Sequence, residues 1–224
     1  MRYPCLVLDH DDTLVRSTPE IHYPSFVETV RLLRPDMPVI TLREFITYNF
    51  DPGFLPMCLN VYKFTDEEMK IEQEIWQRYT QRIPDCYEGF ERLLARYRDG
   101  GGKVCVVSHS ERRVILQHYR AHFGFEPDMV FGWELPEPQR KPHAYPLDAI
   151  METLGFEPKD LLVVDDLKLG LDMARSRNVD FAWAGWSDTA FVTTEFMTEN
   201  AMHRFSTPHE LEEFLMGNER SVGL

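Results

Sequence analysis

The feature that most constrains this chain is a short apolar run that stops abruptly at acidic side chains. Residues 5–8 are apolar throughout, and aspartates follow at positions 9, 11 and 12. A strand that is apolar at every position is buried on both faces, as central strands of parallel sheets are. Side chains alternate along an extended chain, so Asp9 and Asp11 leave it on one side and His10 on the other. Two carboxylates at the end of a buried strand are costly unless a cation or a reaction uses them, so the pattern is typical of catalysis.

Two further apolar runs end in functional groups. Residues 103–107, which are apolar after Lys103, precede Ser108, and residues 161–164 precede Asp165 and Asp166. From Gly89 onward strand-like and helix-like segments alternate, which predicts an α/β fold with a doubly wound parallel sheet. Such sheets bind ligands beyond the carboxyl ends of their strands. We therefore expect the side chains at the three strand ends to meet in one site.

The stretch between residues 17 and 88 differs, because it has helical patterns and no run of the buried-strand kind. Ser25 is expected to cap one helix, and Thr65-Asp66-Glu67-Glu68 is typical of a capping box that starts another. We predict an inserted helical cap domain over residues 17–88 and a core domain made of residues 1–16 and 89–224. Near the end of the core, a loop is expected between the apolar run at 181–184 and residue 201.

The composition of the chain disfavours several classes of function. The formal net charge is -13, which disfavours binding to nucleic acid or to an anionic membrane, because the chain has no basic field to replace counterions. No apolar run has the length of a membrane span. The four cysteines lack paired or metal-ligand spacing, so we expect reduced thiols and a cytoplasmic protein. An anionic substrate would need local positive groups.

Together, the strand ends resemble the motifs of the haloacid dehalogenase-like superfamily. Asp9-x-Asp11-x-Thr13 is similar to the first motif, and Ser108, Lys141 and the Asp165-Asp166 pair follow in the order of the other three. The insertion is placed like the helical cap of the phosphoglycolate phosphatase and β-phosphoglucomutase branch. Each motif alone has a simpler explanation, since aspartate, serine and threonine also start turns and cap helices, and an isolated lysine is usually solvated.

The resemblance implies a role for each acidic residue. Asp9 would be the nucleophile that attacks phosphorus, and Asp11 the group that protonates the leaving oxygen and then activates water. Burial beside other carboxylates is expected to raise the pKa of Asp11 for the first of these tasks. Mg²⁺ would be bound by Asp9, the Asp11 carbonyl and Asp166, with Asp165 holding a metal-bound water.

The remaining assignments concern the substrate. Ser108 and Lys141 would bind the phosphate, and His109 is a candidate substrate contact beside them. His10 is expected to pack in the interior. The insertion offers polar candidates for contacts from the cap, namely Thr18, His22, Arg43, Tyr48 and Lys63.

The sequence therefore predicts a Mg²⁺-dependent phosphatase that acts on a small phosphorylated metabolite through a phospho-aspartate. A phosphotransferase of the β-phosphoglucomutase kind is the alternative, and a non-catalytic phosphate-binding protein is a third. Dehalogenation is disfavoured, because it needs no general acid at the position of Asp11. The pattern indicates no particular oligomeric state.

Overall fold

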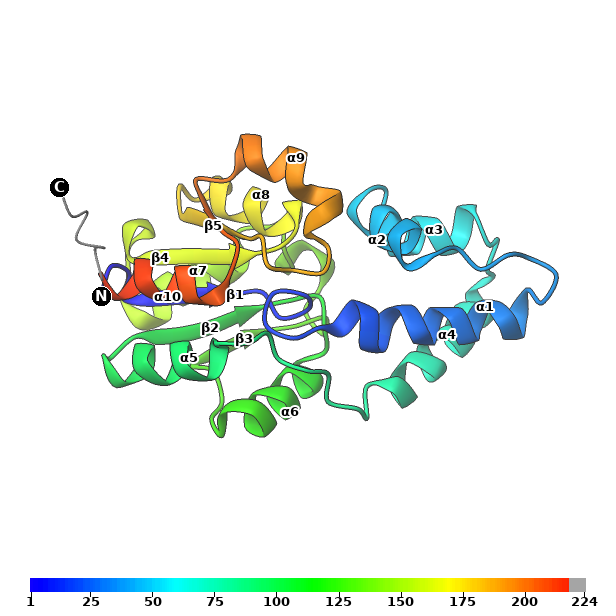
Figure 1. The fold of residues 1–224 in the computed structure, drawn as a ribbon, viewed down its shortest axis with the longest axis horizontal. Helices are drawn as coiled ribbons and strands as arrows, with labels where there is room; N and C mark the ends of the chain where they lie inside the picture. Colours follow the sequence, from blue (N-terminus) through cyan, green and yellow to red (C-terminus); the bar gives the residue numbers. More distant parts are fainter. Residues whose placement is uncertain (218–224) are drawn as a thin grey trace.

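A six-stranded parallel sheet forms the centre of the computed structural model, which describes residues 1–217 (Figure 1). The strand order is β3-β2-β1-β4-β5-β6, and every neighbouring pair is parallel. This confirms the predicted doubly wound α/β fold. The strands are β1 (Cys5–Leu8), β2 (Lys103–Val107), β3 (Met129–Phe131), β4 (Leu161–Asp165), β5 (Asp180–Ala184) and β6 (His203–Phe205).

Side chains alternate between the two faces of β1, and each face packs against a different layer of helices. Leu6 and Leu8 pack with α5, α6 and α10, whereas Cys5 and Val7 pack with α7, α8 and α9 on the opposite face. All four side chains are fully buried, as an apolar run in a central strand requires. The core helices are α5 (Phe90–Asp99), α6 (Arg112–Phe123), α7 (Tyr145–Leu154), α8 (Lys168–Ser176), α9 (Ala190–Asn200) and α10 (Pro208–Met216), with short 3₁₀ turns η2 (Glu137–Gln139) and η3 (Pro158–Asp160).

The register of the central strands aligns their carboxyl ends. Leu8, the last residue of β1, lies opposite Val106 of β2 and Val164 of β4. The chain builds β2 and β3 on one side of β1 and then crosses back to build β4 on the other. In this topology the strand connections diverge around β1 and β4, which is where sheets of this kind bind their ligands.

An inserted group of helices lies beyond that edge (Figure 1). It comprises a π-helical turn η1 (Thr18–His22), α1 (Tyr23–Leu33), α2 (Leu42–Phe50), α3 (Phe54–Asn60) and α4 (Asp66–Tyr79). These helices enclose a hydrophobic cluster of their own around Phe26, Phe45 and Tyr62. The predicted capping box is present, because the Thr65 hydroxyl accepts from the Glu68 amide and the Glu68 carboxylate accepts from the Thr65 amide.

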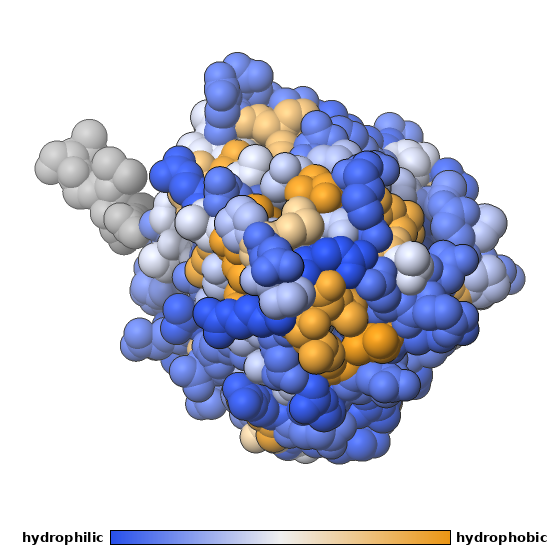
Figure 2. Space-filling view, turned by 90° about the vertical axis from the view of Figure 1, so that its right-hand side faces the viewer, coloured by the Kyte–Doolittle hydropathy of each residue, from blue (hydrophilic) through white to orange (hydrophobic). Residues whose placement is uncertain are grey.

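The outer face of the insertion is mixed in polarity. Figure 2 looks onto this end of the molecule and shows apolar surface gathered within a mostly hydrophilic face. Leu32, Leu55 and Leu59 are among the exposed apolar side chains of these helices.

The division of the chain into a core and a cap domain at residues 16/17 and 88/89 stays a prediction. Residues 218–224 of the predicted core lie outside the described residues.

Two local predictions were wrong. Ser25 caps no helix, because α1 already begins at Tyr23 after η1, and the Ser25 hydroxyl donates to the His22 carbonyl. Pro19 and Pro24 occupy first-turn positions, where proline favours helix, so the chain turns helical earlier than expected. The expected loop before residue 201 contains α9, which has no apolar stripe and buries only Thr193 and Met197.

In the part of the chain that the structure describes, no helix has the length and apolarity needed to cross a membrane.

The close packing of Tyr97 on the backbone gives a test of the fold. A Cβ at Gly102 would lie 2.3 Å from the fully buried Tyr97 ring, whose hydroxyl donates to the Tyr3 carbonyl. We expect Gly102→Ala to lower the free energy of unfolding by about 1–3 kcal/mol, because the ring has to shift. Urea unfolding measures the effect, with Glu152→Ala on the exposed face of α7 as the control. Equal stability of the two variants would contradict this packing.

Candidate active site

Lys141 lies between two carboxylates at the carboxyl edge of the sheet. Its ammonium donates to Asp9 Oδ1 at 2.6 Å and to Asp165 Oδ2 at 2.7 Å. All three side chains are buried. Burial alone would lower the pKa of Lys141, but the charges of Asp165 and Asp9 and the hydrogen bonds to them outweigh it and raise that pKa above its usual value. Lys141 is therefore a permanent cation inside the site.

One lysine does not balance the acidic charge around it. Ligand oxygens of Asp9, Asp165 and Asp166 lie within 4.8 Å of one another, and all three carboxylates are buried. Burial, together with the charges of Asp165 and Asp9, raises the pKa of Asp166 well above its usual value. Burial likewise raises the pKa of Asp9, to about 8. Three hard oxygen ligands in a region short of positive charge fit a divalent cation such as Mg²⁺.

Asp11 has a different environment from the other aspartates. Its Oδ2 accepts from the Ser110 hydroxyl at 2.6 Å and from the Ser108 hydroxyl at 3.2 Å. Its Oδ1 lies 3.3 Å from His22 Nε2. Although burial opposes the charged form, the hydrogen bond from His22 lowers the pKa of Asp11 well below the usual value. The predicted rise in this pKa is therefore wrong for this arrangement.

The error has a simple structural cause. β1 ends at Leu8, and Asp12 has a left-handed backbone with φ of 56°. The alternation that would place Asp11 beside Asp9 therefore ends before Asp11, which lies in a loop and faces hydroxyls and an imidazole. Asp12 accepts a hydrogen bond from the Thr18 amide at the start of η1.

His22 brings the insertion to the site. Its Nδ1 accepts from the Trp76 indole at 3.0 Å, and the two rings are stacked with 8° between their planes. The indole thus fixes the ring so that Nε2 faces Asp11. Among the other polar candidates from the insertion, Arg43 lies over the Phe191 ring of α9, and Tyr48 packs against the hydrophobic cluster of the insertion.

Ser108 and His109 follow β2. Ser108 is buried, and its Oγ accepts from the Ser110 amide while donating to Asp11. His109 Nε2 lies 3.0 Å from the Lys141 carbonyl oxygen, so this ring supports the lysine segment. A contact between His109 and substrate stays a prediction.

Asp165 and Asp166 end β4 and are held in different ways. Asp165 Oδ1 accepts from the Leu167 amide, and its Oδ2 accepts from Lys141. The contact of Asp165 with a metal-bound water stays a prediction. A Cβ at Gly170 would lie 2.3 Å from that Oδ2, so only glycine lets α8 pack so closely on Asp165. Asp166 Oδ2 accepts from the Thr189 hydroxyl, and the Ser187 hydroxyl lies 3.3 Å from the same oxygen.

Several of these contacts were not predicted from the sequence. Ser110, Trp76, Ser187 and Thr189 were not among the candidates. Ser110 had a usable signal, since it follows Ser108 at a spacing of two at a strand end. Ser187 and Thr189 follow β5 in the same way, but that region was expected to be a plain loop.

His10 packs in the interior, as predicted. It is fully buried, and its Nε2 lies 2.9 Å from His118 Nδ1 on α6. The two rings are stacked with centroids 5.1 Å apart. Burial lowers the pKa of His10 to about 3 and that of His118 to about 4, so both rings are neutral in the folded protein.

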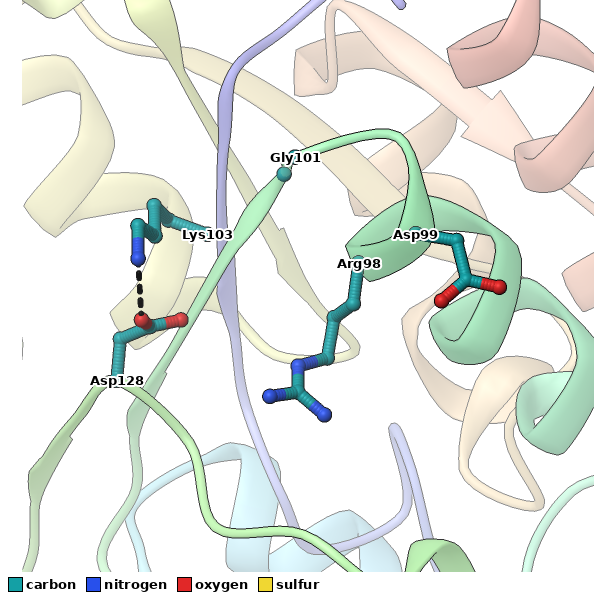
Figure 3. A pocket seen from close by; sticks show the side chains of 6 residues that line it. Arg98, Asp99, Gly101, Lys103 and Asp128 are labelled. Carbon is teal, nitrogen blue, oxygen red and sulfur yellow. Dashed lines mark hydrogen bonds and ion pairs between the residues drawn. The ribbon is translucent and has the colours of Figure 1, made fainter.

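A separate pocket lies at the opposite edge of the sheet. It has a volume of about 270 Å³ and is lined by the end of α5 and the start of β2 (Figure 3). Lys103 donates to Asp128 there at 2.9 Å, and Arg98 and Asp99 add one charge of each sign. The paired, open charges favour no particular ligand, in contrast to the buried cluster at the carboxyl edge.

Comparison with known proteins gives one family and one fold. Residues 6–184 match the sequence model of the family described as haloacid dehalogenase-like hydrolase. The chain is 27% identical over 197 residues to PpaX of Caldanaerobacter subterraneus subsp. tengcongensis, a protein named as a pyrophosphatase, with 85% of this chain and 86% of that protein covered.

Solved structures agree with the fold. A predicted phosphoglycolate phosphatase from Haemophilus somnus superposes with a TM-score of 0.74 at 18% identity, covering 98% of this chain and 99% of the other. A haloacid dehalogenase-like family hydrolase from Streptococcus pneumoniae gives 0.73 at 14% identity, covering 96% and 99%. At these identities the likeness shows the fold.

The histidine pair predicts a loss of stability in mild acid. Both rings have pKa values below the 6.5 of an unperturbed histidine, so the unfolded chain takes up protons that the folded chain does not. The stabilisation is present above pH 6.5 and is lost as the pH falls toward 4. Between pH 7 and 5.5 each histidine should cost about 1 kcal/mol.

Urea unfolding of His118→Asn at these two pH values measures this effect. The asparagine amide can take the place of Nδ1 toward His10, and the variant should lose about 1 kcal/mol less than the parent between the two pH values. His143→Asn, at a half-exposed histidine outside the pair, is the control. An unchanged pH dependence in His118→Asn would show that this ring is not held neutral.

Proposed function

The chain belongs to the haloacid dehalogenase-like hydrolase family and is a phosphatase enzyme, and from this premise we propose that it hydrolyses a small phosphorylated metabolite through a phospho-aspartate on Asp9, with Mg²⁺ as its cofactor. The observation that carries the proposal is the buried cluster of Asp9, Asp165 and Asp166 with Lys141 inserted in it. A purely structural role would not require three buried carboxylates around one cation.

In the first step an oxygen of Asp9 attacks phosphorus, and the bond from phosphorus to the leaving oxygen breaks. Asp11 gives the leaving oxygen its proton. In the second step water attacks the phosphorus of the acyl phosphate, Asp11 takes the water's proton, and Asp9 is released as a carboxylate. Lys141 offsets the charge of the phosphoryl group throughout, and its contact with Asp9 orients the nucleophile.

The hydrogen bonds of Asp11 favour its proposed role as the base that accepts a proton from water. Two serine hydroxyls and His22 stabilise the carboxylate, which is the form that accepts a proton from water. Entry of a leaving group at Oδ1 would displace His22 and remove one of these donors, which would favour the protonated acid. The insertion thereby contributes to the acid-base function of a core residue.

The metal would be held by the carboxylates of Asp9, Asp165 and Asp166 and by the Asp11 carbonyl. When bound, Mg²⁺ neutralises phosphate charge and makes phosphorus more electrophilic. The carboxylate cluster fits this role, because its excess negative charge is buried and Lys141 offsets only part of it.

The substrate is proposed as a small anion that fits between the sheet edge and the insertion. The relatives suggest first candidates, since one is named as a pyrophosphatase and others as phosphoglycolate phosphatases. A panel of phosphorylated substrates should therefore include pyrophosphate, which is a phosphoanhydride, and the esters phosphoglycolate and hexose phosphates. Isomerisation of a hexose phosphate that depends on a bisphosphate would identify a phosphotransferase instead.

The four cysteines are free thiols, which supports a cytoplasmic location.

Replacing the nucleophile gives the most direct test. Asp9→Asn should lower the turnover of an aryl phosphate by roughly 10³-fold or more, because the amide is a poor nucleophile and a poor metal ligand. Steady-state hydrolysis measures the change, and circular dichroism checks the fold. Asp172→Asn, on α8 and outside the cluster, is the matched control and should keep parental activity. Activity of Asp9→Asn within about tenfold of the parent would remove Asp9 from this role.

The choice of metal gives a second test. Asp9 has to offer one oxygen to the cation and the other to phosphorus, which the tight octahedron of Mg²⁺ allows. Ca²⁺ takes more ligands and readily binds both oxygens of a carboxylate. We expect Ca²⁺ to compete with Mg²⁺ and to support turnover at least roughly tenfold lower when present alone. Comparable turnover with Ca²⁺ alone would show that Asp9 does not have this double role.

A further inference from the structure

The segment that follows β5, residues 186–189, touches the aspartate at the end of β4 and also both crossings between the core and the insertion. We propose that Asp188, with Ser187 and Thr189 beside it, couples the position of the insertion to the metal ligand Asp166. These are positioning residues, and the inference rests on the proposed function in that Asp166 binds a divalent cation. The inference goes beyond the proposed function, because it makes the affinity for the cation depend on the two segments that join the core to the insertion.

The two crossings are paired with each other. Val15 and Cys86 form an antiparallel bridge, the Arg16 amide donates to the Asp85 carbonyl at 2.9 Å, and the Tyr87 amide donates to the Leu14 carbonyl at 3.0 Å. Both chains that lead into the insertion therefore move as one short ladder. We call this ladder, residues 14–16 and 85–87, the hinge ladder.

Asp188 binds one side chain from each half of the hinge ladder. Its Oδ2 accepts from Arg16 Nε at 2.9 Å and from the Tyr87 hydroxyl at 2.9 Å. The Asp188 amide in turn donates to the Tyr87 hydroxyl oxygen at 3.0 Å. Three hydrogen bonds thus fix Asp188 relative to the ladder, and its side chain is 33% exposed, so the contact is only partly screened by water.

The neighbours of Asp188 face the other way. The Thr189 hydroxyl donates to Asp166 Oδ2, and the Ser187 hydroxyl donates to the Thr189 hydroxyl oxygen at 2.6 Å and lies 3.3 Å from Asp166 Oδ2. Both residues are buried, as is Asp166. Of these three consecutive residues, Asp188 therefore contacts the hinge ladder, whereas Ser187 and Thr189 lie against the metal ligand Asp166.

Contacts on either side make the segment stiff. At its start, the Trp186 indole donates to the Thr13 carbonyl at 2.9 Å, in the loop that follows β1. After it, α9 begins at Ala190 and contacts the insertion through Phe196 on Phe50 and through Phe191 under Arg43. A shift of the insertion therefore reaches the segment through Asp188 and through α9, while Trp186 ties the start of the segment to the core.

The consequence is reciprocal. Hydroxyl donors to a ligating carboxylate fix its orientation, and their loss typically weakens metal binding 10–100-fold. If the hinge ladder holds these donors in place, then breaking its contact with Asp188 weakens cation binding without touching the cluster. By linkage, the bound cation must then favour the same arrangement of the ladder by the same factor.

The test measures Mg²⁺ affinity by titration calorimetry without substrate. Thr189→Val removes a hydroxyl at constant shape and should weaken binding about tenfold. Tyr87→Phe and Arg16→Gln alter only the hinge side and should weaken it about three- to tenfold. The control Asp148→Asn breaks an ion pair with Arg177 far from the site and should leave the affinity unchanged. Thermal unfolding checks that each variant is folded.

Hydrogen exchange of the parent tests the same coupling without any substitution. Mg²⁺ should slow exchange in peptides that contain the hinge ladder, and the effect should be lost in Thr189→Val. The inference is overturned if both hinge variants bind Mg²⁺ within twofold of the parent, or if Mg²⁺ leaves exchange in the ladder unchanged. A parent that binds no Mg²⁺ overturns the proposed cofactor itself, so failure of the proposed function is distinguished from failure of the coupling.

Discussion

The ammonium of Lys141 between Asp9 and Asp165 is the interaction on which the rest of the site depends. Parallel strands in register bring carboxylates from β1 and β4 to one edge, where burial makes their charges mutually costly. Lys141 offsets part of that cost, and the remaining charge is what a divalent cation would satisfy. The same requirement explains Gly170, since α8 packs so tightly on Asp165 that a side chain there would displace the carboxylate.

The parts of this arrangement that were predictable are those with a local signal. Buried apolar runs predicted β1, β2 and β4, and the rule that parallel strands end at one edge placed Asp9, Ser108 and Asp166 together. Lys141 carries no such signal, because a lysine in a loop looks like any solvated lysine. Only its resemblance to a family motif identified it. Its burial and its two short ion pairs are properties of the folded chain alone.

What was missed depends on contacts between segments far apart in the chain. Asp11 was expected beside other carboxylates, but the strand ends before it and its neighbours come from the insertion and from the loop after β2. α9 was missed because it lacks an apolar stripe. It lies between core and insertion, so both sides of the helix have partners of mixed polarity.

The insertion affects the two halves of the chemistry by different routes. His22 reaches Asp11 directly, so the insertion contacts the proposed acid-base residue. The hinge ladder reaches Asp166 indirectly, through Asp188 and its two hydroxyl-bearing neighbours. Neither Asp9 nor Lys141 has a comparable contact with the insertion among the hydrogen bonds and ion pairs of the described residues. The proposed nucleophile Asp9 is therefore fixed by the sheet, whereas the proposed acid-base group Asp11 and the proposed metal ligand Asp166 have contacts that lead to the insertion. Under the proposed mechanism, such a division would keep the attacking atom in place while water activation depended on the position of the insertion.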